Sequence, residues 1–418
     1  YRYLPLYSVS GLWRISQEPF MASAKWIDNL VVRASYGLQG NIDKNTSPFL
    51  LGNYRIENIL PGGSEDMIDV SGAPNKKLRW EKTHSVNAGF DFAVLNQAIN
   101  LSVDYYYRKG VDLIGTQMLP LETGFEMLTV NWASMRNQGV EVALSTRNVH
   151  TKNFMWTTNF NFAYNNNKVL KEALREDALE PGREGYPAGA LFALKTAGLD
   201  EEGYPMFQDK DGKAVSAMEF FKLQEWGFGA TDLTARERRE LYTYVGTADC
   251  PYTGGFNNTF TYKAFELGVN FSFDFGGKVR SQPTYSIVDF DKGRNTNRDI
   301  LNRWTPENTE TIFPVLLSQN ERLDEYMWYS NQNEIYRNLD IWIRDLNYVR
   351  LQNIRLGYTL PTNFSRTLGM TSATVAIEGR NLLVFGSSYK NYLDPETMSN
   401  AYATPAPKSV TLSLNLIF

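Results

Sequence analysis

The last nine residues, 410–418, constrain the fold of this chain more than any other stretch, because their side chains alternate in character one by one. Every second residue is apolar: Val410, Leu412, Leu414, Leu416 and Phe418. The residues between the first four of them are small and polar: Thr411, Ser413 and Asn415. Successive residues of a β-strand point to opposite faces of a sheet, so this segment predicts a strand with one apolar and one polar face. A half-buried strand of a soluble β-sandwich alternates in the same way, so the number of repeats of the pattern has to decide between the two folds.

The same alternation returns along the whole chain. Its clearest earlier case is a pair of segments at 86–94 and 99–107, joined by four residues, which predicts a hairpin with a short turn. In total the pattern predicts about thirteen strands of about ten residues each: 7–16, 29–38, 86–94, 99–107, 140–145, 156–164, 191–199, 204–207, 256–262, 265–275, 346–358, 371–380 and 410–418. Near the start of the segment 346–358 the apolar phase shifts by one residue, which predicts a β-bulge.

The connections between these strands are of two kinds. Short turns alternate with long stretches that lack a sustained period, and these are the predicted loops: 39–77, 209–247, 276–344 and 382–407. The loop 209–247 also has apolar residues at helical spacing, so we expect a short helix in it. Short turns on one side and long loops on the other are typical of an outer-membrane β-barrel, whose periplasmic turns are short and whose extracellular loops are long.

Composition favours the same architecture and argues against several others. Aromatic residues are 14% of the chain although the mean hydropathy is −0.38, as expected of a barrel with aromatic girdles and a polar lumen. The net charge of −4 gives no indication of nucleic-acid binding. With one cysteine, Cys250, and two histidines, His84 and His150, the sequence offers no thiolate cluster, zinc site or catalytic triad. We therefore expect no cofactor, no metal and no enzymatic activity.

Two acidic motifs have simpler interpretations as turns. The stretch 209–212 begins like a calcium loop but lacks the third ligand and the later bidentate glutamate of an EF-hand. The side chains of Glu201 and Glu202 diverge on an extended chain, so they do not form an acid and base pair. We expect both stretches to be solvated turns.

Two sets of residues are candidates for ligand contact. The first is the predicted polar face of the strands, which either contacts sugars or solvates the inner wall and holds a plug: Asn87, Asp91, Asn100, Asp104, Asn159, Asn161, Asn270 and Asp274. The second is a set of aromatic residues in or beside the predicted outer loops: Trp226, Trp304, Tyr326, Trp328, Tyr329, Trp342, Tyr389 and Tyr392. Aromatic rings suit both sugar rings and peptide side chains, but they also mark membrane interfaces or lid contacts.

Eight short motifs together resemble a known family. In chain order they are Leu-Val-Val-Arg-Ala-Ser-Tyr-Gly from position 30, Leu-Arg-Trp-Glu-Lys-Thr from 78, Val-Asp-Tyr-Tyr-Tyr from 103, Asn-Gln-Gly-Val-Glu from 137, Lys-Thr-Ala-Gly-Leu-Asp from 195, Tyr-Thr-Gly-Gly-Phe-Asn-Asn from 252, Tyr-Val-Arg-Leu-Gln-Asn-Ile from 348 and Tyr-Leu-Asp-Pro-Glu from 392. Their order and spacing over essentially the whole chain resemble the carboxyl-terminal barrel portion of SusC/RagA-type TonB-linked outer-membrane transporters of Bacteroidetes.

This resemblance implies an all-β fold, a transmembrane antiparallel β-barrel of roughly 22 strands with a plugged lumen. It also implies import of oligosaccharides or oligopeptides across the bacterial outer membrane, with a SusD-like surface lipoprotein and with energy from the TonB complex. Residues 1–418 would be the carboxyl-terminal part of that barrel. The plug, the TonB-contact segment and the early strands would then precede this stretch, and Phe418 would be an assembly signal. An adhesin or a barrel-borne enzyme of similar architecture is the alternative.

Overall fold

The computed structural model describes residues 3–42, 48–60, 63–70, 72–125, 127–174, 176–224, 231–281, 298–315, 337–386, 394–398 and 403–418. Eleven strands are hydrogen bonded into one sheet in the order β1-β2-β5-β6-β7-β8-β14-β15-β16-β17-β18. Their bounds are β1 Tyr7–Arg14, β2 Ile27–Asn41, β5 Glu81–Val94, β6 Ile99–Met118, β7 Met127–His150, β8 Phe154–Lys171, β14 Tyr252–Tyr262, β15 Phe265–Arg280, β16 Ile343–Thr359, β17 Ser372–Phe385 and β18 Ser409–Ile417. The chain divides into two compact units, the first made of residues 1–176, 182–188 and 254–268, the second of the remainder.

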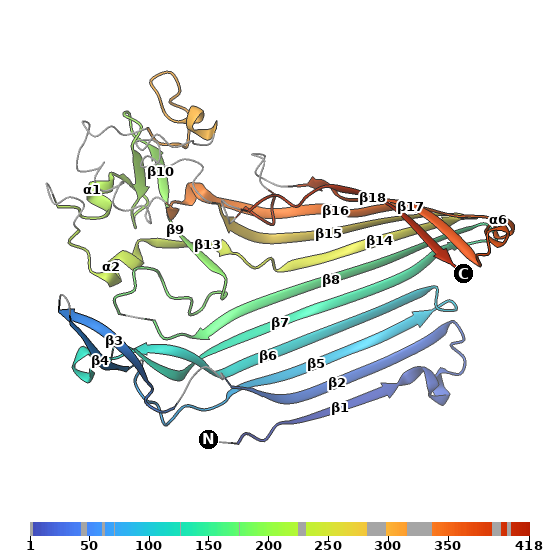
Figure 1. The fold of residues 1–418 in the computed structure, drawn as a ribbon, viewed down its shortest axis with the longest axis horizontal. Helices are drawn as coiled ribbons and strands as arrows, with labels where there is room; N and C mark the ends of the chain where they lie inside the picture. The colour runs from blue at the N-terminus through green and yellow to red at the C-terminus, as the bar shows by residue number, and fades with distance from the viewer. Residues whose placement is uncertain are drawn as a thin grey trace. The chain divides into compact units, whose positions relative to one another are not determined.

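The first unit is built from antiparallel strand pairs: β1 with β2, β2 with β5, and then β5 to β8 in chain order (Figure 1). The predicted hairpin is confirmed, with β5 and β6 joined by residues 95–98, and β7 and β8 are joined by an equally short turn. Two short 3-10 helices, η1 (Ile15–Gln17) and η2 (Pro19–Met21), connect β1 with β2, and η3 (Leu121–Thr123) lies between β6 and β7. Strand β1 ends two residues before the predicted 7–16, whereas the other strands are longer than the pattern predicts, and β7 has 24 residues.

One predicted loop of the first unit is in part a hairpin. Strands β3 (Gly52–Leu60) and β4 (Gly63–Val70) pair with each other inside the stretch 39–77. Tyr54 pairs with Ile68 on one face, and the charged Arg55 and Asp69 lie on the other. The prediction of a structureless loop was wrong here, because frequent Gly, Asn and Asp residues obscure an alternation that is only a few residues long.

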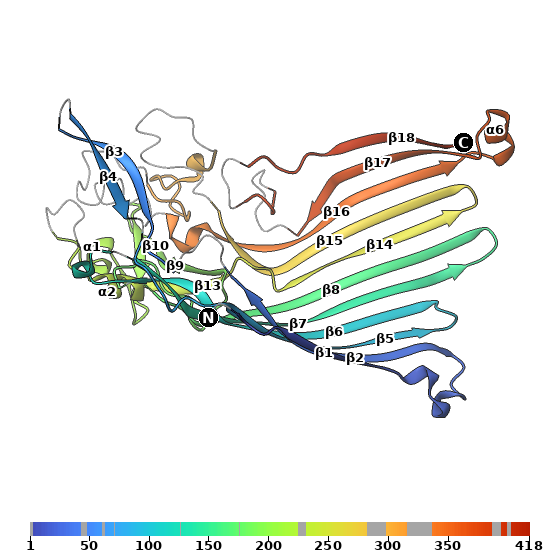
Figure 2. The same cartoon turned by 60° about the horizontal axis from the view of Figure 1, so that its bottom comes forward.

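The second unit contains strands β16, β17 and β18 (Figure 2) and a separate lobe. Strands β16, β17 and β18 pair in antiparallel order, and the register shifts between Leu351 and Asn353, so the predicted bulge is confirmed a few residues further along. Helix α6 (Thr362–Thr367) lies in the connection between β16 and β17. The lobe contains the pair β9 (Ala190–Leu194) and β13 (Tyr242–Thr247). It also contains the small sheet β10 (Thr196–Leu199), β11 (Pro205–Gln208) and β12 (Ala214–Val215).

The lobe has a hydrophobic core of its own. Phe207 stacks on Phe220 with ring centroids 4.9 Å apart and meets Phe221 edge-on. Helix α1 (Ala217–Phe220) and the 3-10 helix η5 (Asp340–Trp342) contribute residues to this core. Helix α2 (Ala235–Glu240) and the 3-10 helix η4 (Arg298–Asn302) also belong to the second unit. The expected helix in 209–247 is therefore present as two short ones. Two of the thirteen predicted strands, 191–199 and 204–207, belong to this lobe, which leaves eleven in the large sheet.

The large sheet has one face with exposed apolar side chains and one polar face. On β18 the side chain of Leu412 is 76% exposed, and Val410, Leu414, Ile377 and Val375 on the same face of β17 and β18 are exposed as well. Side chains opposite each other in an antiparallel pair share a face, so the alternation predicted from sequence is confirmed. Water would oppose such exposure of apolar area, whereas lipid would not. In the part of the chain that the structure describes, no helix is long and apolar enough to cross a membrane.

Candidate functional site

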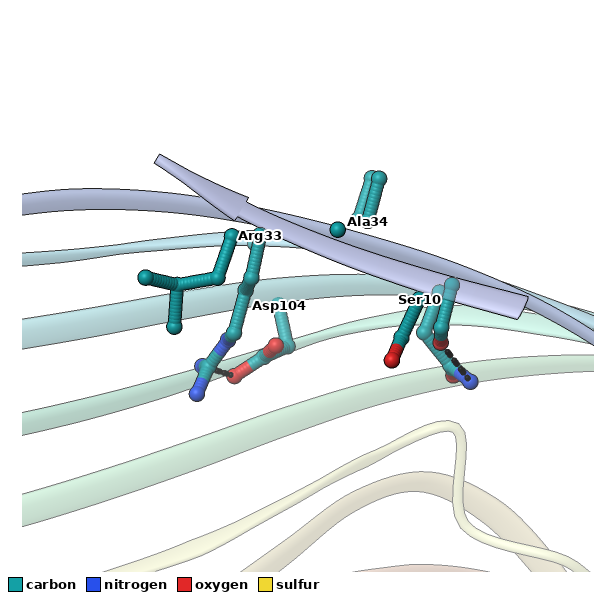
Figure 3. A pocket seen from close by; sticks show the side chains of 10 residues that line it. Ser10, Arg33, Ala34 and Asp104 are labelled. Atoms are coloured by element: carbon teal, nitrogen blue, oxygen red, sulfur yellow. Dashed lines mark hydrogen bonds and ion pairs between the residues drawn. The ribbon is translucent and has the colours of Figure 1, made fainter. Parts of the chain in front are cut away.

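The polar face of the first unit is organised around Arg33 of β2. Its register partner on β5 is Gly89, and the partner of Gly89 on β6 is Asp104, so the three residues form one row across the sheet. Gly89 has no side chain, and the Arg33 side chain extends across it until Nη2 lies 2.5 Å from Asp104 Oδ2 (Figure 3). A methyl group at position 89 would lie 2.3 Å from Asp104 Oδ1, so glycine is what permits this ion pair.

Further polar groups complete this cluster. Arg33 Nη2 also donates to Ser102 Oγ at 3.1 Å and lies 3.4 Å from Asp91 Oδ1, and Ser102 in turn donates to Asp91. The row beside it joins Ser10, Ser35 and Asn87. The two rows line a pocket of about 330 Å³ on the polar face, with Gly11, Leu12, Ala34 and Ala88 (Figure 3). Its lining combines hydroxyl, amide and charged groups, so it suits a hydrated or hydroxyl-bearing molecule.

The polar face of the second unit carries a more deeply buried cluster. The side chain of Arg350 on β16 is only 2% exposed, and its Nη2 is paired with Asp394 Oδ1. Its Nε lies 2.9 Å from Glu396 Oε1. The hydroxyl of Tyr348 lies 3.1 Å from the same glutamate oxygen and 2.6 Å from Asp274 Oδ2 on β15. One guanidinium thus bridges two carboxylates from the connection between β17 and β18.

The pKa of Asp394 in this cluster is set by burial and by the guanidinium of Arg350. Burial acts to raise the pKa of Asp394, but the Arg350 guanidinium and the backbone N–H of Glu396 outweigh it and hold this pKa below its ordinary value. Asp394 is therefore ionised at any pH near neutrality, and its charge is matched by Arg350.

The structure describes only two of the eight predicted loop aromatics. Trp304 is half-buried, and its ring lies over the turn at Gly203, where a Cβ would approach it to 2.5 Å. Trp342 is fully buried in the lobe core and packs near Phe313 with ring centroids 5.9 Å apart. The exposed loop aromatic expected at this position is instead a core residue, because Leu194, Phe207 and Leu339 close around it. The other six lie outside the described residues: Trp226, Tyr326, Trp328, Tyr329, Tyr389 and Tyr392.

Other predicted residues fall where the pattern puts them. Asn87, Asp91, Asp104 and Asp274 lie in the two polar clusters described above. Phe418 is 82% exposed at the end of the chain. No role was predicted from sequence for Arg33, or for Arg350 with its partners Asp394 and Glu396. The only signal was indirect: Arg33 lies in the motif from 30, and the other three residues lie in the motifs from 348 and from 392, which stood out in the resemblance.

The two acidic motifs are turns, as expected. Asp209 Oδ1 accepts hydrogen bonds from the backbone N–H groups of Asp211 and Lys213, and Asp200 Oδ1 accepts from Glu202 and Tyr204. Among the residues that the structure describes, no group of three or more His, Cys, Asp or Glu side chains is arranged to hold a metal ion.

Comparison with known proteins agrees with this architecture. Residues 7–206 match the family described as TonB dependent receptor-like, beta-barrel. TonB-dependent receptor P3 of Formosa agariphila is 26% identical over 436 residues, which cover 97% of this chain and 41% of the relative. TonB-dependent receptor SusC of Bacteroides thetaiotaomicron is 25% identical over 431 residues, 97% of this chain and 39% of the relative. The chain thus spans about two fifths of the length of these relatives.

A solved structure shows the same fold. The structure of the RagAB peptide transporter aligns with a TM-score of 0.75 and 24% identity, over 98% of this chain and 43% of that chain. The fold and its two-faced sheet therefore define a β-barrel protein of the outer membrane. Within that class, residues 7–206 match the TonB-dependent receptor-like β-barrel, and the relatives of the chain are named TonB-dependent receptors.

Proposed function

We propose that this chain forms part of the wall and outer rim of an importer that takes up oligosaccharides or oligopeptides in a TonB-dependent manner. The observation that carries the proposal is the polar face of the sheet, where hydrogen-bonded charged clusters oppose an apolar face with exposed side chains. Such a sheet separates lipid from a polar passage. The names of the relatives, which include SusC and the RagAB peptide transporter, support the same function.

Two partners belong to the proposal. A SusD-like surface lipoprotein would cover the outer side, and the TonB complex would supply energy through a part of the protein outside this chain. The aromatic residues of the outer connections would contact the substrate: Trp226, Trp304, Tyr326, Trp328, Tyr329, Tyr389 and Tyr392. Aromatic faces contribute apolar contact without requiring one particular hydroxyl pattern, so they serve sugars and peptides alike.

Growth of a deletion strain tests the proposal. The full-length gene is deleted and restored, and growth is measured on oligosaccharides and on oligopeptides as sole nutrient, with the corresponding monomers as control. Loss of growth on one class of oligomer, with normal growth on its monomers, supports import. Normal growth on every oligomer combined with lost surface adhesion indicates an adhesin, and oligomer cleavage by the purified protein indicates an enzyme.

A further inference from the structure

The connection between β17 and β18 is bound to a third strand, β16, by ion pairs. Its residues 394–398 contact β16 through the pairs of Asp394 and Glu396 with Arg350. The order of the strands is β15-β16-β17-β18, so this segment reaches across β17 to β16. A hairpin connection needs only a few residues to join neighbouring strands. The connection 386–408 is much longer, and its residues 394–398 contact the sheet.

The anchor lies on the polar face. Arg350 and Tyr348 are two residues apart on β16 and therefore share a face, and the Tyr348 hydroxyl is within hydrogen-bond distance of Asp274 on β15. Gln352, also on this face, donates to Ser272 of β15 at 2.6 Å. The segment 394–398 consequently covers the polar face of these strands, which in the proposed function lines the passage.

The segment is shaped to present both carboxylates to one cation. Asp394 Oδ1 accepts from the backbone N–H of Glu396 at 3.0 Å, and the Asp394 carbonyl accepts from the N–H of Thr397 at 2.9 Å. Pro395 stands between the two acids and restricts the backbone further. Met398 at the end of the turn is only 2% exposed, so the segment is packed against the protein at this end as well.

The ion cluster of Arg350, Asp394 and Glu396 is better explained by the orientation that it imposes on the 394–398 segment than by a gain in folding stability. An apolar group of similar volume often replaces a buried ion cluster without loss of stability, whereas a planar guanidinium bonded to two carboxylates admits one orientation of the segment. We propose that Arg350 is a positioning residue, which holds the 394–398 segment against the polar face so that it narrows the passage and limits the length of imported oligomers. This inference rests on the proposed function.

The test uses the full-length protein in membranes and three variants. Arg350→Met removes the cation, and the triple variant Arg350→Met, Asp394→Asn, Glu396→Gln removes the whole charge cluster without leaving unpaired carboxylates. Arg380→Met is the matched control, because Arg380 pairs with Glu378 two residues before it on β17 and has no ion pair with 394–398 among the described residues. Surface levels are measured first, then amide hydrogen exchange of 394–398 and uptake of a ladder of oligomers of increasing length.

We expect exchange in 394–398 to become at least about tenfold faster in Arg350→Met and in the triple variant, and to stay unchanged in Arg380→Met. The triple variant should reach wild-type surface level and take up longer oligomers than the wild type. Unchanged exchange in both Arg350 variants overturns the anchor, and faster exchange with an unchanged length limit overturns its role in selection. If the wild type takes up no oligomer, the proposed function fails, while the exchange comparison still decides whether the anchor exists.

Discussion

Replacing Gly89 by alanine tests the row of residues that connects β2, β5 and β6. An added Cβ would lie 2.3 Å from Asp104 Oδ1 and 2.8 Å from the backbone carbonyl oxygen of Val103. The carboxylate can rotate away, but the carbonyl belongs to the paired strand β6 and cannot move without distorting the ladder. Gly89→Ala should therefore strain the sheet and displace Arg33 from Asp104.

The magnitude follows from comparison with a second glycine. Gly11 lies on β1, two strands away from β5, and an added Cβ there would have nothing within 4 Å. Both substitutions remove the same backbone freedom from the unfolded chain, which stabilises each variant by about 0.5–1 kcal/mol. Overpacking at position 89 costs about 1–3 kcal/mol, and the half-exposed ion pair adds little. Gly89→Ala should thus be less stable than Gly11→Ala by about 1–3 kcal/mol.

Urea unfolding of the full-length protein in lipid vesicles, followed by tryptophan fluorescence, measures this difference. Gly11→Ala is the control for the lower backbone entropy of the unfolded chain, and this variant should be at least as stable as the wild type. Equal unfolding midpoints for the two variants would show that an alanine side chain fits at position 89 without a clash. The Arg33 side chain would then not lie across Gly89 to reach Asp104, and the description of the Arg33 cluster would be wrong.

Three further predictions concern other parts of the chain. Leu414→Arg on the apolar face of β18 should lower folding yield in bilayers, because a cation facing lipid costs about 2–4 kcal/mol, while Ser413→Arg on the polar face should fold normally; equal yields would refute the assignment of faces. In helix α2 the backbone N–H and hydroxyl of Thr234 lower the pKa of Glu237, so the capping box is intact above about pH 4 and is lost as pH falls through the lowered value. Hydrogen exchange of α2 should accordingly quicken only below about pH 4, and Thr234→Ala should remove that dependence. Deletion of Phe418 should reduce the amount of protein in the outer membrane more than Phe418→Tyr does, as quantified by surface labelling, and equal amounts would argue against an assembly signal.

Strand positions and facing were the parts of the fold that the sequence could supply. Alternation is a local property, so the eleven strands of the large sheet and the exposure of Leu412 and Leu414 follow from it directly. The lobe could not be predicted, because its core joins residues such as Leu194 and Leu339 that are far apart in sequence. The short strands that build it looked like members of the barrel for the same reason.

The sequence predicted some of the carboxylates of the two polar clusters but not their arginine partners. Asp91 and Asp104 were expected on the polar face, but their partner Arg33 depends on the register of three strands and on the missing side chain at Gly89. The pairing of Arg350 with the 394–398 segment joins residues 44 and 46 positions apart, which no local period can reveal. Trp342 resembled an exposed loop aromatic because the stretch 276–344 has no sustained period, whereas its burial depends on apolar residues far away in sequence, such as Leu194 and Phe207.

Energised import of an oligomer is the function proposed for the protein to which this barrel wall belongs. The most direct measurement is uptake of a labelled oligosaccharide and a labelled oligopeptide by cells that carry the full-length protein, with and without a protonophore that collapses the energy supply to TonB. The account predicts that one of the two labels accumulates inside energised cells, remains at the cell surface when energy is removed, and does not accumulate in the deletion strain. Accumulation at the same rate with and without the protonophore, or in the deletion strain, would contradict it.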